Sequence, residues 1–279
     1  MITVNLFDNN FRHSIKEIGF DSASFNKLPT KIKYVRDNMQ FNGITVFTDS
    51  FILDAIVDKV ECDVKIGWCQ ESPIIYPLLQ NLPIEIENKF DYIVTSNKKL
   101  IQKNPHKYKY LPIACCWVSD IQDIKYEKDR LLSHVVSNKH NTIGHLLRHK
   151  ITSFLTEKNI SADIYGYKRF NTKKDPHERY MFSIIVENGK IDGYFSEKLI
   201  DCLIQGTIPI YWGDPNIGDY FNVDGIIPFN DVNEIAQLVI NEEDYIKRKR
   251  AIKENIDICR KKFICVDDNL ADLLQTNLK

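Results

Sequence analysis

The sequence predicts an α/β protein of two lobes, each built around a mostly parallel β-sheet. Short apolar runs alternate with helix-length amphipathic segments along most of the chain, which is typical of strand–helix–strand units. A length of 279 residues is more than one hydrophobic core usually needs and suits two compact lobes. Around residues 117–127 the pattern becomes polar and irregular. We therefore expect an N-terminal lobe at 1–127 and a C-terminal lobe at 128–279.

In the first lobe, short apolar runs predict strands and the segments between them predict helical connections. The expected strands lie at 2–6, 43–48, 64–70 and 92–95, with a weaker one at 109–111. Segments 50–59 and 74–82 carry connections, and Pro73 and Pro77 shorten any helix in the second of these.

The second lobe repeats this alternation from residue 131 onward. Ser137 and Asn138 are cap or turn residues at a strand end, and Gly206 is placed to end a helix. The expected strands are 131–136, 162–165, 208–212 and 226–229, and the expected helices are 144–155, 199–205 and a segment from 233 onward. In the last helical region, apolar residues recur on one face, opposite a basic run at 247–250.

Composition excludes several classes of protein. The net charge of −1 gives no general attraction to nucleic acid, and no stretch approaches the roughly 20 apolar residues of a membrane span. The N-terminus lacks a secretory signal pattern, so we expect a cytoplasmic protein. The 7 cysteines form no CxxC pair and are interpreted as small buried side chains. Asp-x-Asp, a pair that many nucleotide-sugar enzymes use to hold a metal, is absent from the sequence.

The run 182–213, FSIIVENGKIDGYFSEKLIDCLIQGTIPIYWG, carries most of the functional information. It predicts a strand, a loop, a helix that ends at a glycine, and a second strand. The loop leads to a helix N-terminus, where free N–H groups and the helix dipole favour an anion. Glu197 and Lys198 there suit a ligand with both phosphates and sugar hydroxyls, which predicts a nucleotide-sugar site. Taken alone, an exposed first helical turn with a solvated lysine explains the same pair.

The surrounding residues resemble the signature of glycosyltransferase family 10, the α-1,3/1,4-fucosyltransferases. The matching positions are Phe182, Glu187, Asn188, Gly193, Tyr194, Ser196, Glu197, Lys198, Leu199, Gly206, Pro209, Tyr211, Trp212 and Gly213. The segment 68–73 (WCQESP) is similar to the family segment with the proposed catalytic base, and 132–138 followed by Arg148 is similar to a family strand, turn and arginine. The spacing to Arg148 is longer than in the family.

The resemblance implies two Rossmann-like lobes of the GT-B type and a role for each matching residue. Lys198 and Arg148 would neutralise the diphosphate of a GDP-sugar, with Arg169 as a substitute for Arg148. Glu197 and Tyr194 would contact the ribose and sugar. Asn188 would lie in the nucleotide pocket, and Glu187 would either support the loop or contact the ligand. Glu71 would be the general base on the acceptor side.

The implied reaction is inverting, metal-independent transfer of L-fucose from GDP-fucose to a glycan hydroxyl, with no cofactor. Fixed cations can stabilise the negative charge of the leaving diphosphate without a metal. Because the enzyme supplies one general base and no nucleophile, the reaction is a single displacement. Two alternatives remain open: a transferase of the same fold that uses another nucleotide sugar, and an inactive glycan- or nucleotide-binding module. The basic helix at 247–262 is either a solvated face or a peripheral contact with the inner membrane face.

Overall fold

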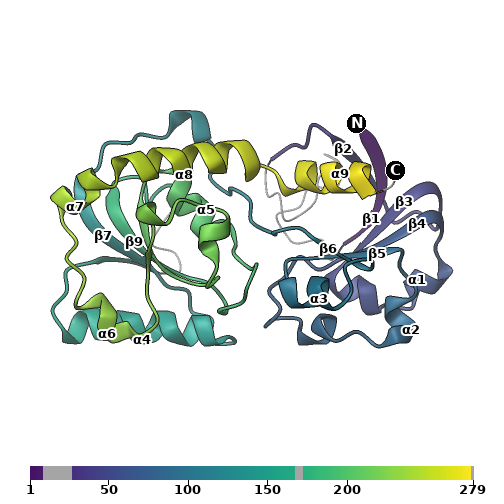
Figure 1. Cartoon of the computed structure of the whole chain (residues 1–279), viewed down its shortest axis with the longest axis horizontal. Coiled ribbons are helices and arrows are strands. Elements are labelled where there is room, and N and C mark those ends of the chain that lie inside the picture. Colours follow the sequence, from purple (N-terminus) through teal and green to yellow (C-terminus); the bar gives the residue numbers. More distant parts are fainter. Residues whose placement is uncertain (9–26, 167–171, 278–279) are drawn as a thin grey trace. The chain divides into compact units, whose positions relative to one another are not determined.

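The computed structural model describes residues 1–8, 27–166 and 172–277 of the chain (Figure 1). By their internal contacts the residues fall into two compact units. The first consists of Met1–Cys115, Asp192–Tyr194 and Ile264–Lys279, and the second of Cys116–Ile191 and Phe195–Phe263. We expected a single boundary near residue 127, whereas the contacts divide the chain after Cys115 and assign two later segments to the first unit.

The first unit contains a six-stranded parallel sheet in the order β2-β1-β3-β4-β5-β6. The strands are β1 (Ile2–Phe7), β2 (Ile32–Arg36), β3 (Gln40–Thr48), β4 (Glu61–Trp68), β5 (Tyr92–Thr95) and β6 (Tyr108–Tyr110). Its helices are α1 (Ile56–Lys59), α2 (Ile84–Glu87), α3 (Lys98–Lys103) and the C-terminal α9 (Val266–Asn277). Within this unit α1, α2 and α3 cover one face of the sheet and α9 lies on the other (Figure 1).

Two details of the first unit differ from the sequence-based expectation. The strand expected at 64–70 ends at Trp68, so Cys69, Gln70 and Glu71 form the loop that follows it. Strand β2 was not predicted. The connection at 74–82 agrees with the expectation: it holds only a short 3-10 turn at Pro77–Gln80, because prolines restrict the backbone there.

Helix α9 packs against β2 through acidic side chains in its first turns. The Tyr34 hydroxyl donates to Asp267 Oδ1 at 2.7 Å, and the Thr30 backbone N–H donates to Asp268 Oδ1 at 2.7 Å. Lys31 Nζ lies 2.6 Å from Asp272 Oδ2. These contacts join the C-terminal segment to the first unit although more than 230 residues of chain separate the partners.

The second unit contains a five-stranded parallel sheet in the order β11-β10-β9-β7-β8. Its strands are β7 (Arg130–Val135), β8 (Asp163–Tyr165), β9 (Tyr180–Val186), β10 (Ile208–Trp212) and β11 (Ile227–Pro228). Its helices are α4 (Ile143–Glu157), α5 (Glu197–Ile204), α6 (Val232–Ile235), α7 (Glu242–Lys247) and α8 (Lys249–Lys262). Helices α4 and α6 cover one face of this sheet, and α5 and α8 cover the other (Figure 1). Two parallel α/β units confirm the predicted fold class.

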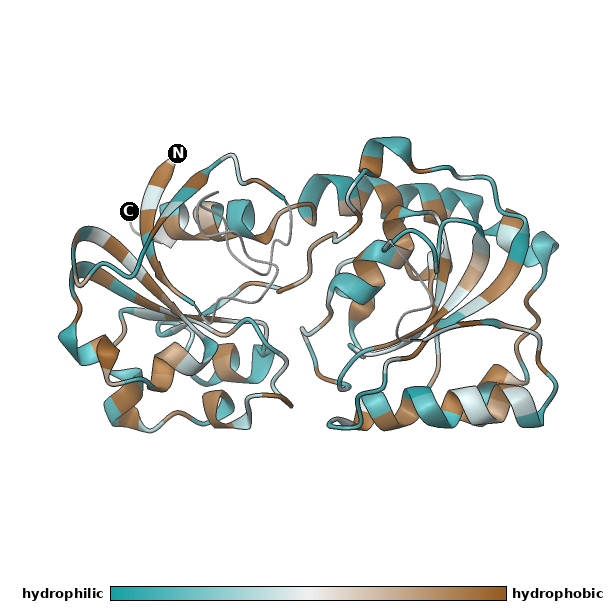
Figure 2. Ribbon diagram, turned by 180° about the vertical axis from the view of Figure 1, so that it is seen from behind, coloured by the Kyte–Doolittle hydropathy of each residue, from teal (hydrophilic) through white to brown (hydrophobic). Residues whose placement is uncertain are grey.

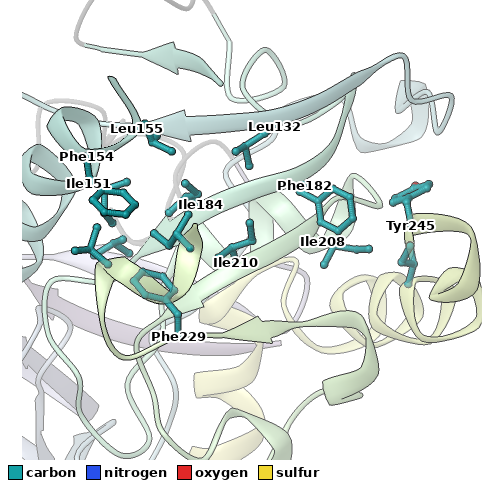
Figure 3. Packing of buried hydrophobic residues seen from close by; sticks show 14 residues of the cluster. Leu132, Ile151, Phe154, Leu155, Phe182, Ile184, Ile208, Ile210, Phe229 and Tyr245 are labelled. Carbon is teal, nitrogen blue, oxygen red and sulfur yellow. The ribbon is translucent and has the colours of Figure 1, made fainter. Parts of the chain in front are cut away.

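Apolar side chains from these strands and helices form the core of the second unit. Figure 3 shows Leu132 from β7, Phe182 and Ile184 from β9, and Ile208 and Ile210 from β10 in one cluster. The helix side is supplied by Ile151, Phe154 and Leu155 of α4, with Tyr245 of α7. The helices carry both polar and apolar residues along their length, as expected for elements that cover one face of a sheet (Figure 2).

Helix α5 begins and ends as the run 182–213 predicts. Ser196 caps its N-terminus, and its hydroxyl accepts from the Lys198 N–H. At the other end Gly206 adopts a φ of 73°, a left-handed conformation that disfavours residues with a Cβ, and its N–H donates to Leu203 O at 2.9 Å. The helix and its two flanking strands are therefore positioned by local sequence.

The basic run at 247–250 spans two helices, because α7 and α8 meet at Arg248. Three of its four side chains form ion pairs one helical turn away: Lys247 with Glu243, Arg248 with Asp244, and Arg250 with Glu254. These pairs reduce the net positive charge that this face presents.

Two absences hold for the part of the chain that the structure describes. None of its helices is both long and apolar enough to cross a membrane. None of the 7 cysteines is in a disulfide, and all but Cys62 are buried.

Candidate active site

The buried side chain of Glu187 connects the loop after β9 to the start of α5. Its carboxylate has no exposed surface and accepts hydrogen bonds from the Ser196 N–H at 2.9 Å and the Ser196 hydroxyl at 2.7 Å. Its backbone N–H donates to Trp212 O, at the end of β10, at 2.9 Å. Glu187 thus fixes the geometry of the loop that delivers the helix N-terminus.

Lys198 lies in the first turn of α5 and is held by three neighbours. Its Nζ donates to Ser196 Oγ at 3.0 Å and to Glu197 Oε1 at 3.2 Å, and lies 3.7 Å from Glu187 Oε2. The side chain keeps 28% of its surface exposed. Lys198 is therefore a fixed and partly exposed cation at a helix N-terminus, as its position in the sequence predicts.

The charges at this helix start change the protonation equilibria of both residues. Burial acts to raise the pKa of the Glu197 carboxyl, but the charges of Lys198 and Lys173 outweigh it and lower that pKa to about 2. Burial acts to lower the pKa of Lys198, but the carboxylates of Glu197 and Glu187 raise it above its ordinary value. Both groups are therefore charged at neutral pH.

The side chain of Arg148, on α4, contacts the end of β9. It is buried, its Nε donates to Val186 O at 3.0 Å, and its Nη2 lies 3.3 Å from Asn188 Oδ1. Its charge acts to lower the pKa of Lys198, so the two cations are near enough to interact. The structure thus brings together four of the predicted donor-side residues: Arg148, Asn188, Glu197 and Lys198.

The start of α4 packs directly on the backbone of the same loop. Gly144 N donates to Asn188 O at 3.2 Å, and a Cβ at Gly144 would lie 1.8 Å from Glu187 O. Only glycine fits at this contact. The next residue, His145, is buried, and burial together with the charges of Arg148, Lys139 and Lys198 lowers its pKa to about 4. Its imidazole is therefore neutral at physiological pH.

The remaining predicted residues belong to the first unit or lie outside the described part. Tyr194 is grouped with the first unit, where the Tyr110 hydroxyl donates to Gly193 O at 2.9 Å. Glu71 follows β4, is half-buried, and its N–H donates to Asp49 Oδ1 at 3.1 Å. Arg169, the substitute for Arg148, lies outside the described residues.

Two further residues near the helix start escaped the sequence reasoning. Lys173 Nζ lies 5.0 Å from the centre of the Trp117 ring, and its charge helps to lower the pKa of Glu197. Asp201 of α5 is buried and accepts hydrogen bonds from the N–H groups of Trp117 at 2.7 Å and Val118 at 3.3 Å. The residues with which Lys173 and Asp201 interact lie far from them in sequence, so no local sequence pattern predicts these interactions. Within residues 1–8, 27–166 and 172–277, no cluster of three or more His, Cys, Asp or Glu could hold a metal.

Comparison with known proteins identifies the family of one segment of the chain. The model described as "Glycosyltransferase family 10 (fucosyltransferase) C-term" matches residues 125–250. These residues form a family 10 glycosyltransferase domain. The resemblance inferred from the sequence is confirmed, and the matched range contains every donor-side residue described above, whereas Glu71 lies outside it.

Curated relatives of the family 10 domain are fucosyltransferases. The α-(1,3)-fucosyltransferase FucT of Helicobacter pylori is 30% identical over 150 residues, which cover 53% of this chain and 30% of that protein. An α-(1,4)-fucosyltransferase of Arabidopsis thaliana is 33% identical over 63 residues, which cover 22% of this chain and 16% of that protein. The matched regions span less than a third of these relatives.

Solved structures resemble the fold over nearly the whole chain. A crystal structure of an α1,3-fucosyltransferase with GDP-fucose aligns with a TM-score of 0.58 and 15% identity, covering 99% of this chain and 90% of that one. The structure of TarM aligns with a TM-score of 0.51 and 14% identity, over 85% of this chain and 55% of that one. The similarity places both units, and not only the family 10 domain, in the GT-B type of fold.

Proposed function

We propose that the chain is an inverting, metal-independent fucosyltransferase that moves L-fucose from GDP-fucose to a hydroxyl of a glycan, with N-acetylglucosamine or glucose as the acceptor sugar. One observation carries the proposal: in a family 10 domain, Lys198 lies at the N-terminus of α5, charged, partly exposed and fixed by Glu187, Ser196 and Glu197. Such a site suits a diphosphate, because helix N–H groups and a cation converge on it.

The donor half of the reaction needs stabilisation of the leaving group. When the bond from the anomeric carbon to the diphosphate oxygen breaks, the electron pair and the negative charge go to the β-phosphate. Lys198 and Arg148 are assigned to this charge. Asn188, next to Arg148, is assigned to the nucleotide pocket, and Glu197 and Tyr194 to the ribose and sugar hydroxyls.

The acceptor half needs a base. The acceptor hydroxyl oxygen forms the new bond to the anomeric carbon while its proton passes to the carboxylate of Glu71, which requires that carboxylate within hydrogen-bond reach. No covalent sugar–enzyme intermediate forms, so attack from the face opposite the departing GDP inverts the configuration.

The donor assignment is tested with Lys198→Ala. A charge-assisted hydrogen bond contributes about 1.5–3 kcal/mol, so GDP affinity should fall roughly 10- to 150-fold in isothermal titration. Lys247→Ala, which removes an exposed lysine from the same unit, is the matched control and should bind GDP as the wild type does. Unchanged GDP affinity of Lys198→Ala would contradict the phosphate assignment.

The base assignment is tested with Glu71→Gln. The expected result is unchanged affinity for GDP-fucose and a fall in transfer of about 10²- to 10⁴-fold, the usual contribution of a general base. Glu85→Gln removes an exposed carboxylate from the same unit and serves as the control. Wild-type turnover in Glu71→Gln would remove Glu71 from the mechanism.

The two alternative functions are separated by a donor screen. Thermal-shift measurements with GDP-fucose, GDP-mannose and UDP-sugars at a hundredfold excess over the dissociation constant should show a stabilisation of about 2.7 kcal/mol for the true donor. Preference for another sugar would identify a different transferase. Binding of GDP without any transfer to a panel of acceptors would identify a binding module.

We also propose a cytoplasmic location, and contact of the 247–262 helix with the inner membrane face. The ion pairs of Lys247, Arg248 and Arg250 weaken the second, because they leave less charge for anionic lipids. Vesicle flotation with and without anionic lipid tests it.

A further inference from the structure

Asp49 occupies an unusual position at the carboxyl end of the first sheet. It follows β3 directly, is 2% exposed and adopts a φ of 44°. Among the described non-glycine residues, only Asp37 and Asn159 share a positive φ. A backbone of this kind persists only where surrounding contacts hold it, and it is found often at functional sites.

The contacts that hold Asp49 lead to the proposed base. A single carboxylate oxygen, Oδ1, accepts the N–H of Gln70 at 2.8 Å and the N–H of Glu71 at 3.1 Å. Strands β3 and β4 are parallel neighbours and Thr48 pairs with Trp68, so Asp49 spans from the end of one strand to the loop after the next. The loop that carries Glu71 is therefore fixed by a side chain from the adjacent strand.

The electrostatics agree with close approach of the two acidic residues. Burial raises the pKa of the Asp49 carboxyl to about 7, the N–H groups of Glu71 and Gln70 act to lower it, and the charge of Glu71 acts to raise it. Burial, reinforced by the charge of Asp49, also raises the pKa of the Cys69 thiol.

We propose that Asp49 is a positioning residue for Glu71: its carboxylate fixes the backbone of residues 70 and 71, so that the Glu71 side chain leaves the sheet at the place where the acceptor hydroxyl must lose its proton. The inference rests on the proposed role of Glu71 as general base. It adds to that role a residue outside the matched family domain and outside the WCQESP segment.

Asp49→Gly and Asp49→Asn form the test. Glycine removes the acceptor while it accommodates the positive φ, and asparagine keeps an acceptor oxygen and also tolerates this conformation. For Asp49→Gly we expect kcat to fall about 10- to 100-fold, because small displacements of a catalytic group are costly, with the KM for GDP-fucose within threefold of the wild type. Asp49→Asn should restore kcat to within about fivefold of the wild type.

A double variant separates positioning from a general structural role. If Asp49 acts through Glu71, Asp49→Gly should have little further effect on the residual transfer of Glu71→Gln; an equal loss in both backgrounds would overturn the inference. Wild-type kcat in Asp49→Gly, or failure of Asp49→Asn to restore kcat, would also overturn it. All rates are measured below the unfolding midpoints, with circular dichroism as the check on folding.

A third substitution at this position, Asp49→Glu, covers the case in which Asp49→Gly does not fold. Asp49→Glu keeps the charge but moves the acceptor oxygens by one methylene, and it should lower kcat at least tenfold with the donor KM unchanged; wild-type kcat would overturn the inference. Loss of transfer in Glu71→Gln with normal kcat in Asp49→Gly removes only the role of Asp49. Full activity of Glu71→Gln removes the proposed base, and the role of Asp49 with it.

Discussion

The contact between Glu187 and Ser196 allows a quantitative prediction about how the helix start is held. Glu187 accepts two hydrogen bonds from Ser196, at 2.9 Å from the N–H and 2.7 Å from the hydroxyl, in a site closed to solvent. Glu187→Ala removes both, and Ser196→Ala removes only the bond from the hydroxyl. The double variant therefore isolates the interaction that the two side chains share.

The expected magnitudes follow from the geometry. A hydrogen bond to a charged group contributes about 1.5–3 kcal/mol, and an unsatisfied buried N–H costs about 1–3 kcal/mol. Glu187→Ala also removes the desolvation cost of a buried carboxylate, and this gain offsets part of the loss of stability. We expect Glu187→Ala to lower the free energy of unfolding by about 2–4 kcal/mol, and Ser196→Ala, which also loses a helix cap, by about 1–2 kcal/mol. The coupling energy between the two changes should be about 1–2 kcal/mol.

Chemical denaturation followed by tryptophan fluorescence measures these values, since the Glu187 N–H bonds to Trp212 O in the same unit. Ser119→Ala, at an exposed hydroxyl of that unit, is the control and should be additive with Glu187→Ala within about 0.5 kcal/mol. A Glu187–Ser196 coupling below about 0.5 kcal/mol would refute the reasoning that Glu187 holds the start of α5.

Three other substitutions test the second unit. Gly144→Ala should lower the free energy of unfolding by roughly 1–3 kcal/mol despite the higher helix propensity of alanine, because its Cβ meets a backbone oxygen at 1.8 Å. For Gly166→Ala the nearest atom among the described residues is 4.0 Å from the new Cβ, and the change should be less than about 0.5 kcal/mol in denaturant titrations. Burial raises the pKa of Asp201 to about 7 from about 4 in an unfolded chain, so its ionisation destabilises the fold as pH rises from 4 to 7. Asp201→Asn should equal the wild type in stability near pH 3 and exceed it by up to about 4 kcal/mol at pH 7.5; an identical difference at both pH values would contradict this. Lys173→Met should weaken GDP binding about 5- to 30-fold in calorimetry, and Lys174→Met should leave it unchanged if the effect is local.

The sequence predicts most clearly the elements whose residues are uniformly buried. Strands β5 and β10 have the bounds that their apolar runs predict. Strand β2 escaped prediction because its sequence, IKYVR, mixes charged and apolar residues at the edge of a sheet. On one side it has no neighbouring strand among the described residues. Apolar periodicity is a weak signal for such a strand.

Assignment of residues to a unit was less predictable than the elements themselves. Helix α9 belongs to the first unit through bonds from Tyr34 and Thr30 to its aspartates, and partners this far apart leave no trace in a local pattern. At the site, the chain motif predicted which charged residues are neighbours, but not that Glu187 is fully buried or that Asp201 binds the backbone of Trp117. Those facts depend on which segments the sheet brings together.

The charge balance at the start of α5 explains why Lys173 enters the predictions. Arg148 and Lys198 are offset by Glu187 and Glu197, so these four residues carry no net charge, although the sequence suggests a cationic site. His145 adds none, since burial and neighbouring cations lower its pKa to about 4. A helix N-terminus contributes the equivalent of about half a positive charge, which is too little for the two charges of a diphosphate. If GDP-fucose binds here, there are two ways to balance its charge. Either Lys198 pairs with the phosphate as well as with its carboxylate partners, or a further cation takes part. Lys173 already acts on the pKa of Glu197, so we test it as the source of that charge.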